Sequence, residues 1–187
     1  MTLPSESSGL SAKVNGHYQA EQPSVVPKPV EYIQQTRDRY DSLGYPPYQW
    51  FQAEEVPKLA QMSKSLSDAK LGLVSTGGTY VKGQKAFYYK DDASIRQISS
   101  QTDPEDLRFS HIMENYLVEA WQDPGVLFPI EQLRSMEQDG LIGSLADNFI
   151  SCMGGIYSQR KVISELIPKI EAVVDKQKLD LLFLVPL

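Results

Sequence analysis

The sequence is poor in the residues that most often build reactive centres. Its 187 residues include a single cysteine, Cys152, and two histidines, His17 and His111. One cysteine excludes a disulfide within the chain and fits a reducing compartment. One cysteine and two distant histidines also form no ligand cluster, so we expect neither a metal site nor a bound cofactor.

Positive charge and long apolar runs are scarce as well. The 18 lysine and arginine residues are outnumbered by 24 acidic residues, which gives a net charge of -6 at pH 7. Such a surface does not attract nucleic acid or an anionic membrane. The longest apolar run, residues 181–187, is far too short to span a bilayer, and the first residues lack the features of a signal peptide. We therefore expect a cytoplasmic protein that binds neither nucleic acid nor membrane.

The composition divides the chain into an arm and a domain. Residues 1–29 contain Ser, Gln, Pro and Gly without a hydrophobic period, which predicts a disordered or loosely attached arm. Residues 30–187 are long enough for a single domain. Its first helix is predicted at residues 30–43, where apolar residues share one face, and Gly44 stops it. The aromatic segment at residues 45–50 contains two consecutive prolines, so we interpret it as a loop packed over the core edge.

From residue 71 onward, strand-like and helix-like patterns alternate. Short apolar or alternating runs predict strands at residues 71–74, 107–111, 141–145 and 181–185. A short amphipathic helix is predicted at residues 129–140, with Pro129 at its first position. A longer helix at residues 162–176 either kinks at Pro168 or starts near Ser164.

This alternation predicts the fold class. Strands separated by helices indicate an α/β fold with an open, mostly parallel sheet flanked by helices. The last strand is apolar on both faces, as expected for a buried central strand.

Candidate sites follow from the predicted sheet, because ligands of such sheets bind outside the carboxyl ends of the strands. This rule selects the turn after residue 74, the pair Ser110 and His111, the turn after Leu145, and whatever follows Leu187. The first turn can present backbone N–H groups and two hydroxyls to an anion. It carries no P-loop or dinucleotide fingerprint, so a plain turn stays equally open. The candidate substrate-binding residues in this turn are Ser75, Thr76, Gly77 and Gly78.

His111 is the candidate catalytic residue. It stands at a predicted strand end, and a side chain that titrates near neutrality suits general acid catalysis. The alternative is a histidine hydrogen-bonded beneath a loop. Cys152 has apolar neighbours and no adjacent cation or histidine, so we interpret it as a buried structural residue.

Several segments together resemble the selenoprotein B family of glycine, sarcosine, betaine and D-proline reductases. The matching stretches are residues 73–84 (LVSTGGTYVKGQ), 107–111 (LRFSH), 123–133 (DPGVLFPIEQL), 140–146 (GLIGSLA) and 181–187 (LLFLVPL). Residues 30–50 also resemble an amino-terminal extension of some proteobacterial-type members. The resemblance thus covers about residues 30–187.

The resemblance implies a chemistry. In that family, the strand that resembles residues 181–187 runs directly into a redox-active selenocysteine or cysteine, which cleaves a carbon–heteroatom bond reductively. We therefore expect the nucleophile immediately after Leu187, in a domain that is incomplete at its carboxyl terminus. A selenocysteine codon, UGA, taken as a stop would produce this ending.

The same resemblance implies roles and partners. His111 would donate a proton or orient the substrate, and the turn at residues 75–78 would hold a substrate carboxylate. The expected partners are a small amine, amino-acid or thioether substrate, and other reductase subunits or a second copy of the chain.

The sequence also departs from the family. After Ser110 and His111 many relatives continue with a second histidine and an acidic residue, whereas Ile112, Met113 and Glu114 follow here. The resemblance therefore does not extend to a role that needs two histidines. Cys152 stands where relatives usually have an aromatic or apolar residue.

Two other functions stay open. The alternative is a non-catalytic α/β subunit that binds a partner through its exposed last strand, whose apolar residues need a cover. A third possibility is a small anion- or nucleotide-binding module at residues 75–78, although this turn lacks a Lys or Arg at P-loop spacing.

Overall fold

The computed structural model describes residues 31–46, 52–112, 114 and 117–187. The chain divides into two units, Met1–Pro57 and Lys58–Leu187. The predicted arm and most of the aromatic segment at residues 45–50 lie outside the described residues. The domain predicted at residues 30–187 spans the boundary between the two units.

The first unit contains helix α1 (Tyr32–Ser42), which confirms the helix predicted at residues 30–43. Gly44 follows the C-cap residue Leu43, and its φ of 69° lies in the left-handed region that commonly terminates helices. The N–H of Gly44 donates to the Asp41 carbonyl at 2.9 Å, which satisfies one of the last carbonyls of the helix.

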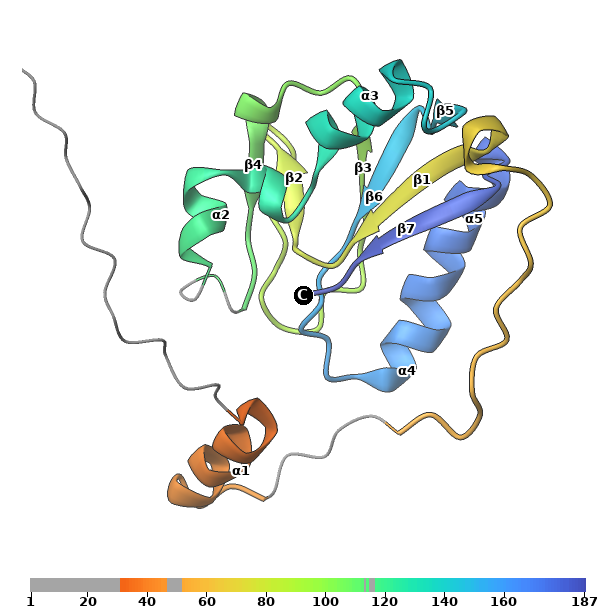
Figure 1. Ribbon diagram of the computed structural model, residues 1–187. Helices are drawn as coiled ribbons and strands as arrows, with labels where there is room; N and C mark the ends of the chain where they lie inside the picture. Colours follow the sequence, from red (N-terminus) through yellow and green to blue (C-terminus); the bar gives the residue numbers. More distant parts are fainter. Residues whose placement is uncertain (1–30, 47–51, 113, 115–116) are drawn as a thin grey trace, which may run out of the picture. The chain divides into compact units, whose positions relative to one another are not determined.

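The second unit is built on a mixed sheet with β1 at its centre (Figure 1). Its strands are β1 (Lys70–Ser75), β3 (Arg96–Ser99), β5 (Ser144–Leu145), β6 (Asn148–Ser151) and β7 (Leu181–Val185). Strands β5 and β6 pair parallel with one edge of β1, and β7 pairs parallel with β1 over its whole length. Strand β3 adds to β6 in the antiparallel direction. The α/β fold predicted from the sequence is confirmed.

Helices cover both faces of this sheet. Helix α3 (Ile130–Gln138) packs its Leu133 against Leu71 and Leu73 of β1. On the opposite face, helix α5 (Ile167–Gln177) packs against Val74 of β1. The predicted helix at residues 129–140 is confirmed, with Pro129 immediately before its first turn.

The helix before β7 is longer than predicted. A continuous helical run consists of α4 (Gln159–Lys161), the π-helical turn η5 (Val162–Leu166) and α5. The predicted start near Ser164 is wrong, because the run begins at Gln159. A π-helical turn shifts the hydrogen-bond register, and Pro168, which has no N–H to donate, lies in the first turn after that shift.

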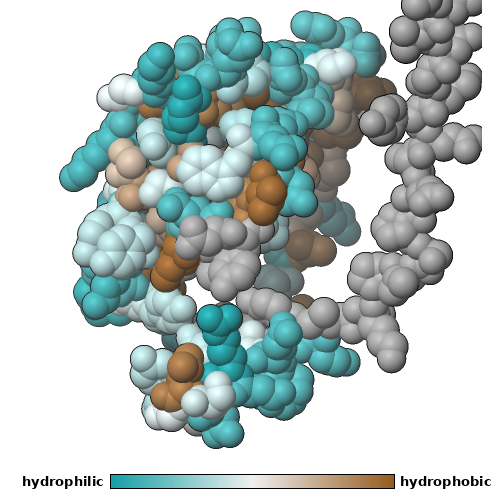
Figure 2. All heavy atoms as spheres, turned by 90° about the vertical axis from the view of Figure 1, so that its left-hand side faces the viewer, coloured by the Kyte–Doolittle hydropathy of each residue, from teal (hydrophilic) through white to brown (hydrophobic). Residues whose placement is uncertain are grey.

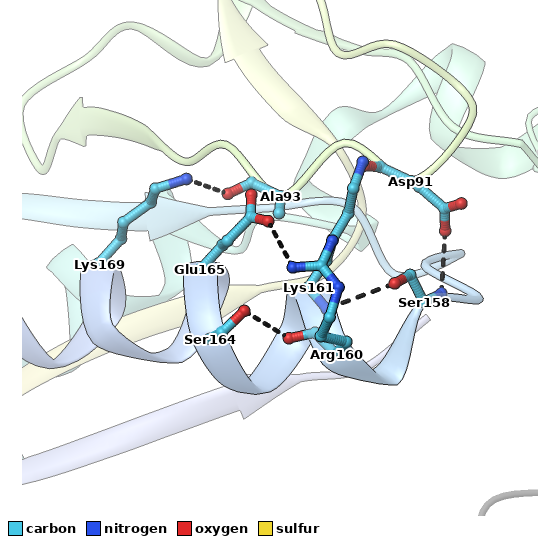
Figure 3. A network of polar contacts seen from close by, with 8 residues as sticks. All are labelled: Asp91, Ala93, Ser158, Arg160, Lys161, Ser164, Glu165 and Lys169. Carbon is cyan, nitrogen blue, oxygen red and sulfur yellow. Dashed lines mark hydrogen bonds and ion pairs between the residues drawn. The ribbon is translucent and has the colours of Figure 1, made fainter.

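The loop before β3 is fastened to the start of this helical run (Figure 3). The Asp91 carboxylate accepts hydrogen bonds from the backbone N–H groups of Tyr157 at 2.8 Å and Ser158 at 3.0 Å. The ammonium of Lys161 donates to the Asp91 carbonyl at 3.0 Å, and that of Lys169 donates to the Ala93 carbonyl at 2.7 Å. These bonds hold the loop to the helix that covers one face of the sheet.

A second, two-stranded sheet lies beside the first. Strands β2 (Thr79–Val81) and β4 (Leu107–Phe109) pair antiparallel. The strand predicted at residues 107–111 is therefore confirmed over its first three residues, but it is not part of the main sheet. Helix α2 (Val118–Gln122) packs Trp121 against Phe109, with ring centroids 4.7 Å apart. On this side of the molecule, hydrophobic residues form separate patches among hydrophilic ones (Figure 2).

The short helical turns lie in loops. They are η1 (Leu66–Asp68), η2 (Pro104–Asp106) and η4 (Pro124–Val126). None of the helices in the described part of the chain is both long and apolar enough to cross a membrane.

One predicted strand begins later than expected, and a further strand follows it. Of residues 141–145 only Ser144 and Leu145 form a strand, and pairing resumes at β6, which the sequence did not predict. The N–H of Ala146 donates to the Leu71 carbonyl at 2.8 Å, so the chain continues along β1 instead of turning away. The predicted site after Leu145 is therefore wrong. The carboxyl end of this part of the chain along β1 is the end of β6, at Ser151. Polar residues at positions 147 and 148 hide the strand pattern in the sequence.

The last strand, β7, is not the buried central strand that its sequence predicts. Among the described residues it pairs only with β1 and forms an edge of the main sheet. Phe183 is 43% exposed and Leu184 is 63% exposed. The prediction was wrong because apolar residues on both faces of a strand indicate only that burial would be favourable. Whether the strand is buried depends on the elements that pack around it.

Candidate functional site

The carboxyl ends of three parallel strands meet at one edge of the main sheet (Figure 1). Ser75 at the end of β1 is in register with Ser151 at the end of β6 and with Val185 at the end of β7. Ligands of open α/β sheets bind beyond such ends, so this edge is the candidate site.

The turn that follows β1 is held by its own N–H groups. The N–H of Thr76 donates to Val185 O at 3.0 Å, and that of Gly78 donates to Cys152 O at 2.9 Å. The N–H of Gly77 donates to Ser75 Oγ at 3.1 Å, and this fully buried hydroxyl donates to Leu127 O at 2.7 Å. The N–H groups of Thr76 and Gly78 thus join strand ends, and that of Gly77 is bonded within the turn, an arrangement that does not favour the anion-binding module.

The side chain of Thr76 binds the main chain of Leu187. Thr76 Oγ1 accepts a hydrogen bond from Leu187 N at 2.7 Å and donates to Leu187 O at 3.4 Å. Gly154 lies against the same carbonyl, because a Cβ at this position would stand 2.5 Å from Leu187 O. Leu187, two residues after β7, is therefore held at the site.

His111 reaches this edge from the second sheet. The N–H of Ser110 donates to Gly78 O at 3.0 Å, and a Cβ built on Gly78 would lie 3.8 Å from His111 Cδ2. Gly78 has a φ of 66°, and a side chain there would overlap the Ser110 carbonyl oxygen. A glycine is therefore required for the histidine segment to approach the turn so closely.

Burial determines the protonation state of His111. Its side chain is 4% exposed, and the loss of solvent lowers its pKa below the usual value, although the charge of Glu114 opposes this shift. At neutral pH the ring is an uncharged imidazole that can donate one hydrogen bond and accept another.

The loop after β6 completes the candidate site, and the sequence did not single it out. A Cβ on Gly155 would stand 2.5 Å from Ile112 Cγ2, so this loop packs against the segment that follows His111. The pair Gly154 and Gly155, directly after an apolar run, was the available signal, because adjacent glycines often mark a close approach of two backbones. The site thus consists of residues 76–78, 111–112, 152–155 and 186–187.

Cys152 lies within this edge but is buried, with 1% of its surface exposed. Its thiol donates a hydrogen bond to Ser75 O at 3.6 Å, and burial raises its pKa to about 11. The prediction that Cys152 is a buried residue is confirmed.

The polar groups of the site are hydroxyls, one imidazole and main-chain atoms. In the part of the chain that the structure describes, no three His, Cys, Asp or Glu side chains gather in a way that could hold a metal ion. The hydroxyl of Ser151 is buried without a hydrogen-bond partner among the described residues. Because Ser151 is in register with Ser75, it places a further polar atom at the carboxyl edge.

Comparison with known proteins relates the chain to a reductase subunit. It is 30% identical over 129 residues to D-proline reductase subunit gamma of Acetoanaerobium sticklandii. The match covers 68% of this chain and 52% of the relative, so the chain spans about half the length of that protein. No family model matches the chain. No solved structure matches it. The reductase relationship expected from the sequence is thus supported at the level of a related subunit.

Proposed function

We propose that the chain is part of a reductase subunit that cleaves a carbon–heteroatom bond reductively. In this proposal the reacting group is the selenolate or thiolate of a residue that directly follows Leu187. The observation that carries it is the position of Leu187, which is bound by Thr76 at the carboxyl edge of the sheet. A side chain that follows Leu187 would leave the sheet next to the turn at residues 75–78.

The chemistry of the first step is a nucleophilic displacement. The chalcogenolate attacks the carbon and forms a carbon–chalcogen bond, while the heteroatom leaves with the electrons of the broken bond and takes up a proton from water. An external thiol then attacks the chalcogen, forms a chalcogen–sulfur bond and releases the carbon, which takes the electrons of the broken carbon–chalcogen bond and a proton. A selenol or an activated thiol suits the first step, because a low pKa keeps it ionised at neutral pH. Cys152 does not suit it, since burial raises the pKa of its thiol to about 11.

His111 orients the substrate in this proposal. Its lowered pKa leaves the ring uncharged at neutral pH, so it can donate a hydrogen bond to the leaving heteroatom. In this proposal Ser75, Thr76, Gly77 and Gly78 form the wall of the substrate site next to the reacting group. Their N–H groups and the Ser75 hydroxyl already bind within the protein, so this turn gives the wall a fixed shape.

The test begins with the coding sequence past Leu187 and continues with the full-length protein. We expect a selenocysteine or cysteine codon next, and thiol-dependent cleavage of an amine, amino-acid or thioether substrate. Replacing that residue by serine should abolish cleavage and leave the thermal unfolding temperature unchanged. Any other residue at that position, or full activity of the serine variant, contradicts the proposal.

A second candidate function has its own supporting observation. An apolar groove of about 380 Å³ runs along β7, lined by residues that include Leu133, Met136, Leu181 and Phe183. Strand β7 also has an unpaired edge within the described residues and carries no charged residue. Such an edge is suited to pairing with another strand. In this function the chain is a non-catalytic subunit, and another subunit of the reductase covers β7.

The two candidates differ in the effect of a charge on β7. Leu184→Lys should weaken assembly with the other reductase subunits if they cover β7, as measured by size-exclusion chromatography of the purified mixture. Leu141→Lys is the matched control, because Leu141 is similarly exposed but lies outside β7. Equal assembly of both variants contradicts this second function.

A further inference from the structure

We propose that Thr76 is a positioning residue, whose side chain sets the direction in which the residue after Leu187 leaves the sheet. The chemical consequence of this inference rests on the proposed function. The contact itself is a property of Thr76 and Leu187, which lie 111 positions apart in the sequence.

The hydrogen bonds between β1 and β7 change at Thr76 from main-chain to side-chain acceptors. The backbone N–H of Thr76 donates to Val185 O at 3.0 Å, which continues the regular ladder. In a regular parallel ladder the next bond would run from Leu187 N to the Thr76 carbonyl. Here the Thr76 hydroxyl accepts that bond at 2.7 Å. The side chain thus takes the place of a main-chain acceptor where the ladder ends.

The hydroxyl is also able to hold both polar groups of Leu187. It accepts from Leu187 N and donates to Leu187 O, and one hydroxyl can make both bonds because it has one proton and two lone pairs. Pro186 precedes Leu187, and its ring restricts φ, so the segment enters these bonds with little conformational freedom. An apolar side chain of the same shape, such as valine, can bind neither group.

Gly154 limits the movement of Leu187 from another side. A Cβ at this position would stand 2.5 Å from Leu187 O and 3.1 Å from both Thr76 O and Thr76 Oγ1. The Leu187 carbonyl therefore occupies space that only glycine leaves open. Together Thr76 and Gly154 determine where the main chain of Leu187 lies.

The consequence for the chemistry follows from the connection between the two residues. One planar peptide group joins Leu187 to the Cα of the next residue. A fixed Leu187 carbonyl therefore fixes the position of that Cα. A displacement of about 1 Å in a reacting group can lower a rate by about a hundredfold. Loss of the Thr76 hydroxyl should therefore lower the rate of bond cleavage.

The experiment uses the full-length protein and compares Thr76→Val with Thr76→Ser. Valine keeps the shape and removes the hydroxyl, whereas serine keeps the hydroxyl. We expect Thr76→Val to increase the hydrogen-exchange rate of the Leu187 amide about threefold to tenfold, as the loss of one hydrogen bond predicts. We also expect its rate of bond cleavage to fall at least about tenfold. Thr76→Ser should resemble the wild type in both, and both variants should unfold at similar temperatures.

A second variant approaches Leu187 from the other side. Gly154→Ala keeps the Thr76 hydroxyl but displaces the Leu187 carbonyl, so it should also lower the rate of bond cleavage. Unchanged exchange at Leu187 in Thr76→Val, an equal loss in Thr76→Ser, or unchanged cleavage in Thr76→Val overturns the inference. If the wild type cleaves no substrate, the proposed function fails, and the exchange rates alone then decide whether Thr76 holds Leu187.

Discussion

The thiol of Cys152 donates a hydrogen bond to the carbonyl oxygen of Ser75, 3.6 Å away on the neighbouring strand. The backbone N–H of Cys152 donates to the same oxygen at 2.9 Å. Both residues are almost completely buried, and burial raises the pKa of the thiol to about 11. The sulfur atom of Cys152 thus lies within the candidate site as a protonated thiol. It joins two strands by its hydrogen bond and is not a nucleophile at neutral pH.

The first prediction concerns the reactivity of Cys152. With a pKa of about 11, only about one thiol in a thousand is ionised at pH 8, and the thiolate is the form that reacts. We expect iodoacetamide to modify Cys152 at least about a hundredfold more slowly in the native protein than in denaturant. Mass spectrometry of the peptide that contains Cys152 measures both rates. Rapid modification of the folded protein would show that the thiol is accessible and ionised.

The second prediction compares two glycines with similar backbone angles. Gly78 has a φ of 66° and Gly140 a φ of 70°, so alanine at either position carries a similar backbone strain. Only at Gly78 would the added Cβ overlap another atom, the Ser110 carbonyl oxygen, whereas Gly140 has open space. We expect Gly140→Ala to lower the free energy of unfolding by about 1 kcal/mol, and Gly78→Ala by about 2 kcal/mol more. Urea unfolding measures both, and equal losses would show that Ser110 can move aside.

The third prediction is the pH dependence that His111 contributes to stability. Its folded-state pKa lies below the value of about 6.5 expected in the unfolded chain. Between these two values the unfolded state binds more protons, so the free energy of unfolding falls as the pH decreases through the unfolded pKa toward the lower folded-state pKa. This stability is fully present above the unfolded pKa and is lost as the pH falls toward the folded pKa.

The variant His111→Gln tests this dependence. It should show a flatter profile of unfolding free energy against pH in this window, where most carboxylates remain ionised. Equal slopes in His111→Gln and the wild type would indicate that the pKa of His111 is the same in both states.

The fourth prediction concerns Asp91, which has a φ of 51° and binds the N–H groups of Tyr157 and Ser158. Figure 3 shows the bond to Ser158. Alanine removes the acceptor and tolerates this backbone angle poorly, so Asp91→Ala should lower the free energy of unfolding by about 2 kcal/mol. Asparagine keeps an acceptor oxygen and tolerates the left-handed region, so Asp91→Asn should lose less than half as much. Thermal unfolding compares the two, and identical losses would indicate that the negative charge is what matters.

The local features of the fold could be predicted from the sequence because they depend on neighbouring residues. The apolar run before Ser75 predicted β1, the helical spacing after Pro129 predicted α3, and the run at residues 181–185 predicted β7. Alternation of such segments indicated an α/β fold, and the expected carboxyl edge led to His111 and the turn at residues 75–78. These predictions rest on side-chain periodicity, which a single segment carries by itself.

Only the tertiary structure decided which strands pair and what they leave exposed. The sequence pattern of β4 does not reveal that it pairs with β2 in a second sheet, and that of β7 does not reveal that it forms an edge. The contact of Thr76 with Leu187 joins residues 111 positions apart. Gly154 permits this contact because a Cβ at its position would overlap the Leu187 carbonyl oxygen. Such contacts arise when distant segments meet in space, so local patterns determine the elements, whereas the candidate site depends on long-range pairing of the backbone.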